Sequence, residues 1–126
     1  MMNTDHQIGI TVQTAYVAGH SSPTDSRYSY AYTITIRNEG RIGAQLLRRH
    51  WIITDADGRV QEVRGDGVVG EQPVLAPGEA FRYTSGCVLE TPVGVMHGTY
   101  NMVDANGVAF DAAIPPFRLA VPGLVH

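Results

Sequence analysis

The sequence predicts an all-β chain in which about seven short strands form two packed antiparallel sheets, a β-sandwich. Apolar and polar residues alternate along segments near the N-terminus, as they do on half-buried strands. Two glycine-containing turn sequences interrupt later apolar runs, and prolines in the second half disfavour helices. The length of 126 residues suits one domain, 1–126, with flexible tails expected at 1–7 and 122–126. A small barrel is the alternative arrangement of the same strands.

The first two strands are predicted by strict alternation. Tyrosine and isoleucine occupy every second position of residues 28–37, and apolar residues alternate in the same way over residues 8–16. The polar segment between them, 20–26, is typical of a loop. We therefore expect two half-buried strands, and we expect the aromatic rings of one face to be core residues rather than a platform for nucleic-acid bases, namely Tyr28, Tyr30 and Tyr32.

Two similar turns predict β-hairpins. Residues 55–58 read Asp-Ala-Asp-Gly and residues 104–107 read Asp-Ala-Asn-Gly, and such pairs ending in glycine supply the positive backbone angles of tight connections. In the first turn, Asp55 and Asp57 are expected to cap local amides rather than to act as acid and base. The strands flanking the turns are expected at 44–54 and 59–64, at 95–103 and 108–114, with a further strand at 80–85.

The segment 44–54 also satisfies helical spacing at Leu47, Trp51 and Thr54. Its composition favours a strand, because Gly43 precedes it, a turn ends it, and β-branched and aromatic residues fill its second half.

Composition excludes several functions. All nine basic residues are arginine, so the chain has no lysine for a Schiff base or for a Walker-type phosphate loop. The net charge of −3 gives no general attraction for nucleic acids or anionic membranes. One cysteine, Cys87, cannot form an internal disulfide, the N-terminus lacks a secretory signal, and no apolar run is long enough to span a bilayer. A cytoplasmic protein is therefore expected.

Several motifs resemble the ApaG family, and together they extend over nearly the whole chain. They are Leu46-Leu47-Arg48-Arg49-His50-Trp51, Gly65-Asp66-Gly67-Val68-Val69-Gly70-Glu71-Gln72-Pro73, Leu75-Ala76-Pro77-Gly78-Glu79, then Phe81, Tyr83, Ser85 and Gly86, and Thr91-Pro92-Val93-Gly94. The resemblance implies a fibronectin type III-like or immunoglobulin-like sandwich. It implies neither an enzymatic reaction nor a cofactor. Bacterial members are encoded near a diadenosine tetraphosphate hydrolase, and related domains of eukaryotic F-box and polymerase-interacting proteins suggest partner recognition.

The pattern G-x-G-x-x-G occurs after the first hairpin and has two interpretations. Glycine amides could bind an anion, so the segment could hold, or weakly hydrolyse, a pyrophosphate-containing nucleotide. However, Gln72-Pro73 prevents a following helix, and the carboxylate inside the loop opposes a phosphate. The alternative is an architectural loop with both valines against the core. The candidate anion-binding residues are Arg64, Gly65, Asp66, Gly67, Val68, Val69 and Gly70.

The arginine-rich strand presents a mixed apolar and cationic strip whichever face is exposed. Alternation places Leu46, Arg48, His50 and Ile52 on one side and Leu47, Arg49, Trp51 and Ile53 on the other. Arginine beside large apolar groups is typical of protein-binding hot spots, so the predicted partner contacts are Arg48, Arg49, His50 and Trp51. Alternatively, the arginines cover apolar neighbours and pair with Glu39, Glu62 or Asp55.

The sequence gives little support for a metal site or for nucleophilic catalysis. No histidines or cysteines have metal-ligand spacing, so an effect of the family on cobalt or magnesium tolerance would be indirect. Cys87 or Ser85 with His50 or His97 as base is a weak candidate for nucleophilic catalysis. We therefore predict a non-enzymatic protein-interaction module without a cofactor. Its partner is another protein, with a homodimer through an unpaired edge strand as a further possibility.

Overall fold

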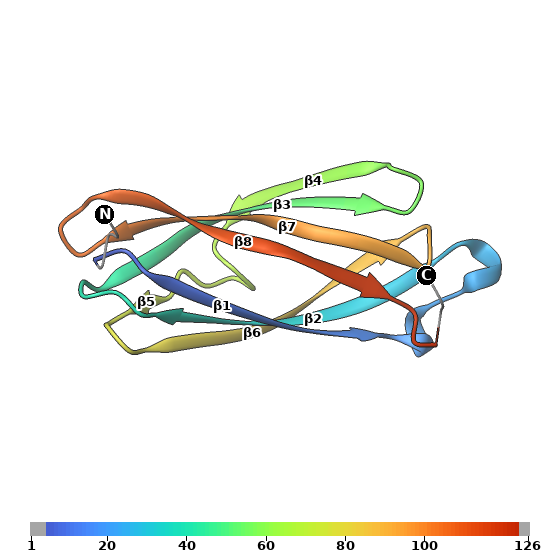
Figure 1. Cartoon of the computed structure of the whole chain (residues 1–126), viewed down its shortest axis with the longest axis horizontal. Coiled ribbons are helices and arrows are strands. Elements are labelled where there is room, and N and C mark those ends of the chain that lie inside the picture. Colours follow the sequence, from blue (N-terminus) through green and yellow to red (C-terminus); the bar gives the residue numbers. More distant parts are fainter. Residues whose placement is uncertain (1–4, 124–126) are drawn as a thin grey trace.

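The computed structural model describes residues 5–123, which form two antiparallel sheets packed face to face (Figure 1). The strands are β1 (Ile8–Tyr16), β2 (Tyr28–Asn38), β3 (Ala44–Asp55), β4 (Val60–Asp66), β5 (Val74–Leu75), β6 (Ala80–Leu89), β7 (Val93–Asp104) and β8 (Ala109–Ala120). Two short 3-10 helices, η1 (Ala18–His20) and η2 (Pro23–Asp25), lie between β1 and β2. One sheet has the order β1-β2-β6; the other has the order β4-β3-β7-β8, with β5 paired to β3. The predicted two-sheet sandwich is confirmed.

The alternation predicted in β2 is confirmed. Tyr30, Tyr32, Ile34 and Ile36 are all buried in the core, and Tyr28 is half-buried against it. Since the β-period places every second side chain on the same face, one strand contributes a whole row of the core.

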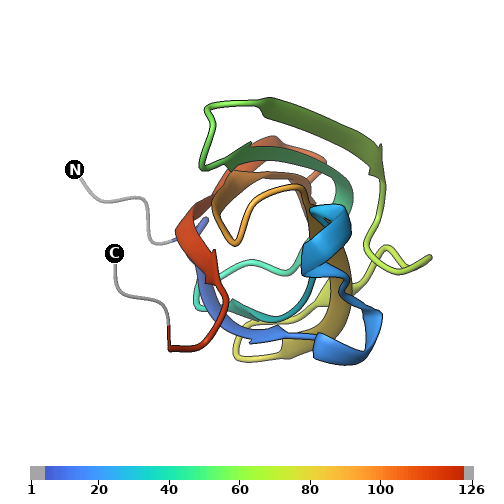
Figure 2. The same ribbon diagram turned by 90° about the vertical axis from the view of Figure 1, so that its right-hand side faces the viewer.

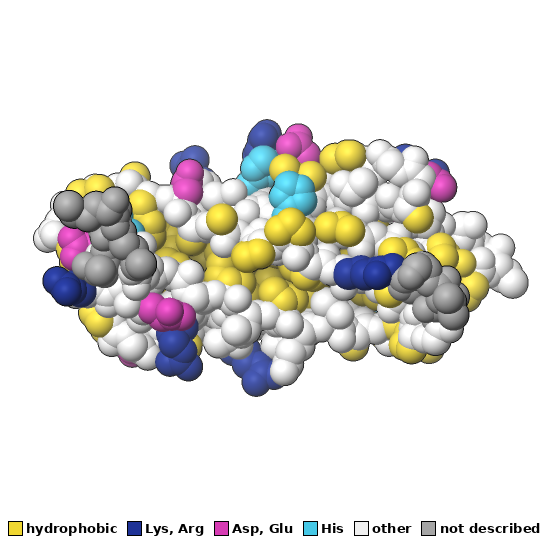
Figure 3. Space-filling view, viewed as in Figure 1, with side chains coloured by type: hydrophobic (Ala, Val, Ile, Leu, Met, Phe, Trp, Pro, Cys, Tyr) yellow, Lys and Arg dark blue, Asp and Glu magenta, His cyan; other side chains and the backbone are white. Residues whose placement is uncertain are grey.

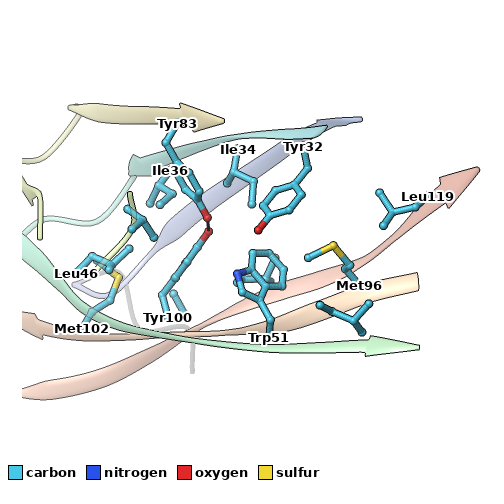
Figure 4. Packing of buried hydrophobic residues seen from close by; sticks show 14 of the residues in the cluster. Tyr32, Ile34, Ile36, Leu46, Trp51, Tyr83, Met96, Tyr100, Met102 and Leu119 are labelled. Atoms are coloured by element: carbon cyan, nitrogen blue, oxygen red, sulfur yellow. Dashed lines mark hydrogen bonds between the residues drawn. The ribbon is translucent and has the colours of Figure 1, made fainter. Parts of the chain in front are cut away.

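Trp51 lies at the centre of the core, between the two sheets (Figure 4). Its ring meets that of Tyr32 edge-on at 5.5 Å and that of Tyr100 at 6.3 Å. The hydroxyls of Tyr83 and Tyr100, from opposite sheets, are hydrogen-bonded to each other, and burial raises the pKa of both phenols. Because Trp51 points inward, the opposite face of β3 is the one exposed.

Both predicted hairpins are present. Gly58 and Gly107 take positive φ angles of 84° and 81° in the two turns. In the first turn, Asp55 Oδ1 accepts hydrogen bonds from the amides of residues 57 and 59. In the second, Asp104 Oδ1 accepts them from the amides of residues 106 and 108. The capping expected of Asp55 is therefore seen, whereas the Asp57 carboxylate accepts from the Arg59 side chain; Asp104 caps the second turn in the same geometry as Asp55.

Two predicted strand ends are corrected, and one strand is present that the sequence does not predict. β8 does not end at Ile114 but continues through Pro115-Pro116, which is tolerated because β8 is an edge strand and needs no amide on its outer side. β6 continues beyond Ser85 to Leu89, and β5 forms within a segment expected to be loop.

The two open sides of the sandwich differ (Figure 2). On one side, β1 and β8 pack against each other, and His6 stacks on Phe110 at 4.0 Å and reaches Asp104 through Nε2 at 2.7 Å. On the other side, β4 and β6 flank a groove. Of the tails predicted to be flexible, residues 1–4 and 124–126 lie outside the described residues.

Candidate functional site

The two segments predicted as binding surfaces lie side by side. Antiparallel pairing of β3 with β4 places Arg48 opposite Asp66, Arg49 opposite Gly65, and His50 opposite Arg64. Between them lies a shallow depression of about 550 Å³, which we call the β3–β4 depression. It is lined by Arg48, Arg49, His50, Arg64, Gly65, Asp66, Thr99, Asn101 and Asp111.

A β-bulge decides which side chains of β3 reach this surface. The register of β3 against β7 shifts between Leu46 and Arg48, so Leu47 is the extra residue. Leu46 is therefore buried although strict alternation groups it with Arg48, and that part of the sequence prediction is wrong. Beyond the bulge, alternation holds, with Arg48 and His50 outward and Trp51 inward.

Two exposed ion pairs, Arg48–Asp66 and Arg64–Glu62, and a hydrogen bond between His50 and Glu62 cross the depression and its rim. Arg48 Nε lies 3.7 Å from Asp66 Oδ1, His50 Nε2 lies 3.2 Å from Glu62 Oε1, and Arg64 Nη2 lies 3.9 Å from the same Glu62 oxygen. In the space-filling view, basic, acidic and histidine side chains gather along the upper edge, where β3 and β4 lie (Figure 3). Solvent-exposed pairs of this kind contribute only about 0–1 kcal/mol, so a binding partner can replace them at little cost.

Arg49 has a different role from Arg48. Its Nη1 donates to the carbonyl oxygens of Asp66 and Gly67, both at 3.0 Å. The guanidinium lies over Gly65, where a Cβ would come within 2.7 Å of Nη1. A side chain at position 65 would therefore have to displace the guanidinium, and in the present arrangement Arg49 holds the start of the glycine loop.

The glycine loop, residues 65–70, is followed by a turn and then the short strand β5, and no α-helix occurs in residues 5–123. Val69 and Gly70 form a tight turn with φ angles of 44° and 81°, closed by paired backbone hydrogen bonds between Val68 and Glu71. The amide of Gly67 donates to the carbonyl of Leu47 at 2.8 Å. Backbone amides that already donate hydrogen bonds to carbonyl oxygens do not point toward an anion site.

Two candidate residues lie elsewhere than predicted. Trp51 is 2% exposed, so it is a core residue and not a surface contact. Val68 is buried as the architectural interpretation expects, whereas Val69 is 55% exposed, because it occupies the tip of the turn. The prediction that both valines contact the core is thus wrong for Val69.

Three polar residues of the depression were absent from the sequence prediction: Thr99, Asn101 and Asp111. Asn101 donates to Asp111 at 2.8 Å across β7 and β8. The hairpin centred on residues 104–107 already implies that these two residues lie opposite each other, which is the signal that could have found them. Their position beside β3 depends on the pairing of β3 with β7, which the sequence does not reveal.

The candidate nucleophiles and the candidate bases lie on different sides of the sandwich. Ser85 and Cys87 lie on the inner face of β6, in line with the buried Tyr83, whereas His50 lies on the outer face of the opposite sheet. His97 pairs in register with Ile52, a residue of that outer face. Burial raises the pKa of the Cys87 thiol to about 11, which disfavours the thiolate.

Within the described residues, no three histidine, cysteine, aspartate or glutamate side chains are grouped so that they could hold a metal ion. Those residues also contain no helix of the length and apolar character needed to cross a membrane.

Comparison with known proteins gives consistent matches. A family model described as ApaG domain matches residues 18–104. Protein ApaG of Pseudomonas paraeruginosa is 60% identical over 126 residues, with all of both chains covered. Protein ApaG of Escherichia coli O1:K1 / APEC is 56% identical over 120 residues, which is 95% of this chain and 96% of that protein. The crystal structure of the putative ApaA protein from Bordetella pertussis superposes with a TM-score of 0.93 at 51% identity, covering 96% of this chain and 98% of that one.

Proposed function

The chain belongs to the ApaG domain family, and from that premise we propose that it is a non-enzymatic protein-interaction module whose contact surface is the β3–β4 depression. One observation carries the proposal: two exposed arginines and a half-buried histidine surround a concave surface on a well-packed sheet. Arginine is enriched in the residues that dominate binding energy at protein interfaces.

The charges of the depression suit a polar protein surface. The side chains of Arg48 and Arg64 are 72% and 71% exposed, so both can exchange their present carboxylates for those of a partner. Thr99 and Asn101 of β7 add hydrogen-bonding groups on the other side of β3. The matching partner surface carries carboxylates spaced to reach both arginines.

The underlying scaffold supports recognition because it positions these side chains without large motion. Trp51, the residue next to His50, is locked in the core by ring contacts with both sheets. Binding to such a preformed surface loses little conformational entropy. Any contribution to cobalt or magnesium tolerance would then act through the bound partner.

The proposal is tested by quantitative affinity capture from a lysate of the source organism. We compare wild type, the double variant R48A/H50A, and R82A. Arg82 is also an exposed arginine but lies on the other sheet, so its replacement is a matched control. A partner retained by wild type and R82A, and reduced at least about tenfold by R48A/H50A, is expected, since hot-spot truncations cost about 2 kcal/mol or more. Equal retention by all three proteins, or no retained partner, contradicts the proposal.

Nucleotide titration followed by amide chemical shifts distinguishes the rival hypothesis. Shifts confined to residues 65–70 on addition of diadenosine tetraphosphate would identify the glycine loop as a pyrophosphate site and overturn the proposal. We expect the loop to be silent, because the amides of Gly67, Val68 and Glu71 are already bonded to carbonyl oxygens.

A further inference from the structure

β4 is an edge strand whose open side remains available for pairing. It lies outermost in its sheet (Figure 1), and β3 is its one strand partner among residues 5–123. None of its seven residues is buried. An exposed strand edge is a template for another extended chain.

The backbone groups that face the open side follow from the pairing with β3. The amide of Gly67 donates to the carbonyl of Leu47, and the amide of Asp55 donates to the carbonyl of Arg59. Hydrogen-bonded pairs alternate along an antiparallel ladder, so Gln61, Val63 and Gly65 direct their backbone groups toward β3.

Glu62 and Arg64, which lie between these positions, direct their N–H and C=O groups toward the open side. Both side chains lie on the outer face with His50. The open edge ends at Asp66, because its carbonyl oxygen accepts from Arg49. The segment that can pair is therefore centred on residues 62–64.

We infer that this edge binds a second copy of the chain, with β4 antiparallel to β4 of the partner subunit and the two-fold axis at Val63. Among the registers centred on residues 62–64, the segment that can pair, only this one places opposite charges opposite each other. Glu62 then lies opposite Arg64 of the partner subunit, and Arg64 lies opposite Glu62 of the partner subunit. Since both positions face the open side, the two opposed pairs are also the hydrogen-bonded ones.

Neighbouring registers are disfavoured by charge. Moving the axis to residue 62 places two glutamates opposite each other, and moving it to residue 64 places two arginines opposite each other. Like charges directly opposed on a sheet are destabilising. The choice of a second copy as the occupant therefore rests on the self-complementary order of Glu62 and Arg64 about Val63.

Val63 supports the same arrangement from the inner face. Its side chain is 40% exposed and lines the groove of about 320 Å³ between β4 and β6, together with Val88, which is 43% exposed. On the two-fold axis, Val63 would meet its symmetry mate as a non-hydrogen-bonded pair, the position at which side chains approach most closely. The dimer thereby covers apolar surface that the single chain exposes.

The paired edge is short, so the dimer is expected to be weak and concentration-dependent, as interfaces below about 1,200 Å² are. Sedimentation velocity across a concentration series tests this directly. E62R and R64E should each raise the dimer dissociation constant about tenfold, because each variant replaces two attractive cross-strand pairs with two repulsive ones. The double variant E62R/R64E restores opposite charges and should return the constant to near the wild-type value.

Cysteine crosslinking tests the register. In a C87S background, V63C should form an intermolecular disulfide on mild oxidation, because the two Cβ atoms meet at the axis. Q61C is the matched control; it lies two residues from the axis on the same face, too far from its symmetry mate to crosslink. Crosslinking of Q61C but not of V63C would overturn the register.

A wild-type protein that stays monomeric at all concentrations would overturn the inference. So would a dimer whose dissociation constant is unchanged in both E62R and R64E. Arg64 also lines the β3–β4 depression, so R64E can affect both partner capture and the dimer; E62R and R48A/H50A are the variants that separate the two proposals. R48A/H50A leaves Glu62, Val63 and Arg64 intact, so loss of partner capture and loss of the dimer are separate results.

Discussion

The β3–β4 and β7–β8 hairpins are closed by the same turn chemistry, yet their outer strands have opposite environments. β4 has no buried residue, whereas β8 buries Ala112, Ile114 and Leu119. β8 lies against β1, whose apolar side chains help to close that side of the core, while β4 borders an open groove. The comparison teaches that turn sequence determines pairing, and that the opposite sheet determines which paired strand becomes part of the core.

The aspartates of the two turns also differ in the partner of their second carboxylate oxygen: that of Asp104 is nearly buried, and that of Asp55 is exposed. Asp104 Oδ2 lies 2.7 Å from His6 Nε2, and these side chains are only 2% and 17% exposed. Asp55 Oδ2 lies 2.7 Å from Nε of Arg59, whose side chain is 53% exposed. The β7–β8 turn is thus held by the N-terminal segment, and the β3–β4 turn is held by its own arginine at the surface.

The largest expected difference concerns the two outer strands. L119A should lower the free energy of unfolding by about 2–5 kcal/mol, because it leaves a cavity where a fully buried leucine packs. V63A on β4 should cost less than about 1 kcal/mol, because the valine is 40% exposed. Urea denaturation of dilute protein measures both values. Similar losses would show that β4 contributes to the core as much as β8 does.

Replacing the two adjacent arginines of β3 should also lower the free energy of unfolding by unequal amounts. R49A leaves the carbonyl oxygens of Asp66 and Gly67 without their charged donor, so we expect a loss of about 1–3 kcal/mol and faster proteolysis of the glycine loop. R48A should stay within about 0.5 kcal/mol, since its pair with Asp66 is exposed. Denaturation and limited proteolysis measure the two effects. Equal behaviour of the two variants would contradict the assigned role of Arg49.

Local signals in the sequence were sufficient for most of the fold. Alternation located β1 and β2, and the two turns located both hairpins, because these features depend on neighbouring residues. The bulge at Leu47 could not be predicted, since it depends on the alignment of β3 with β7. The continuation of β8 through Pro115-Pro116 could not be predicted for a similar reason, because these prolines are tolerated at a bulge of an edge strand, which only the pairing with β7 reveals.

The candidate site was predictable in part. The turn at 55–58 implies that the arginine-rich segment lies opposite the start of the glycine loop, whereas the sequence prediction describes two separate surfaces. The burial of Trp51 and the inward role of Arg49 required knowledge of which face of β3 meets the other sheet.

Acid should weaken both turns through the aspartate that caps each of them. The hydrogen bond with His6 lowers the pKa of Asp104 below 3.8, and the hydrogen bond with Arg59 does the same for Asp55. A carboxyl group whose folded pKa is lowered contributes stability that is present above the unfolded pKa and is lost as pH falls through the folded value. D104N and D55N should each reduce the loss of stability on acidification, as measured by denaturation from neutral pH to about pH 2.

Salt provides the control for this pair. Added salt should weaken the Asp55 contribution more, because Arg59 is half exposed whereas His6 and Asp104 are nearly covered. Equal salt dependence of H6A and R59A would mean that the two turns are held in equivalent environments.

The smallest effect should come from the turn that follows β4, which lacks the favourable residues of the two hairpin turns. Val69 has a φ of 44°, a left-handed conformation that is costly for a β-branched residue, and the glycine follows it at position 70. V69N creates the Asn-Gly pair preferred in such turns and should raise the free energy of unfolding by about 0.5–1 kcal/mol. V74N is the matched control, an exposed valine in β5 without a positive φ, where asparagine should be neutral or slightly destabilising. If V69N destabilises the chain as V74N does, contacts of the valine side chain outweigh the backbone strain.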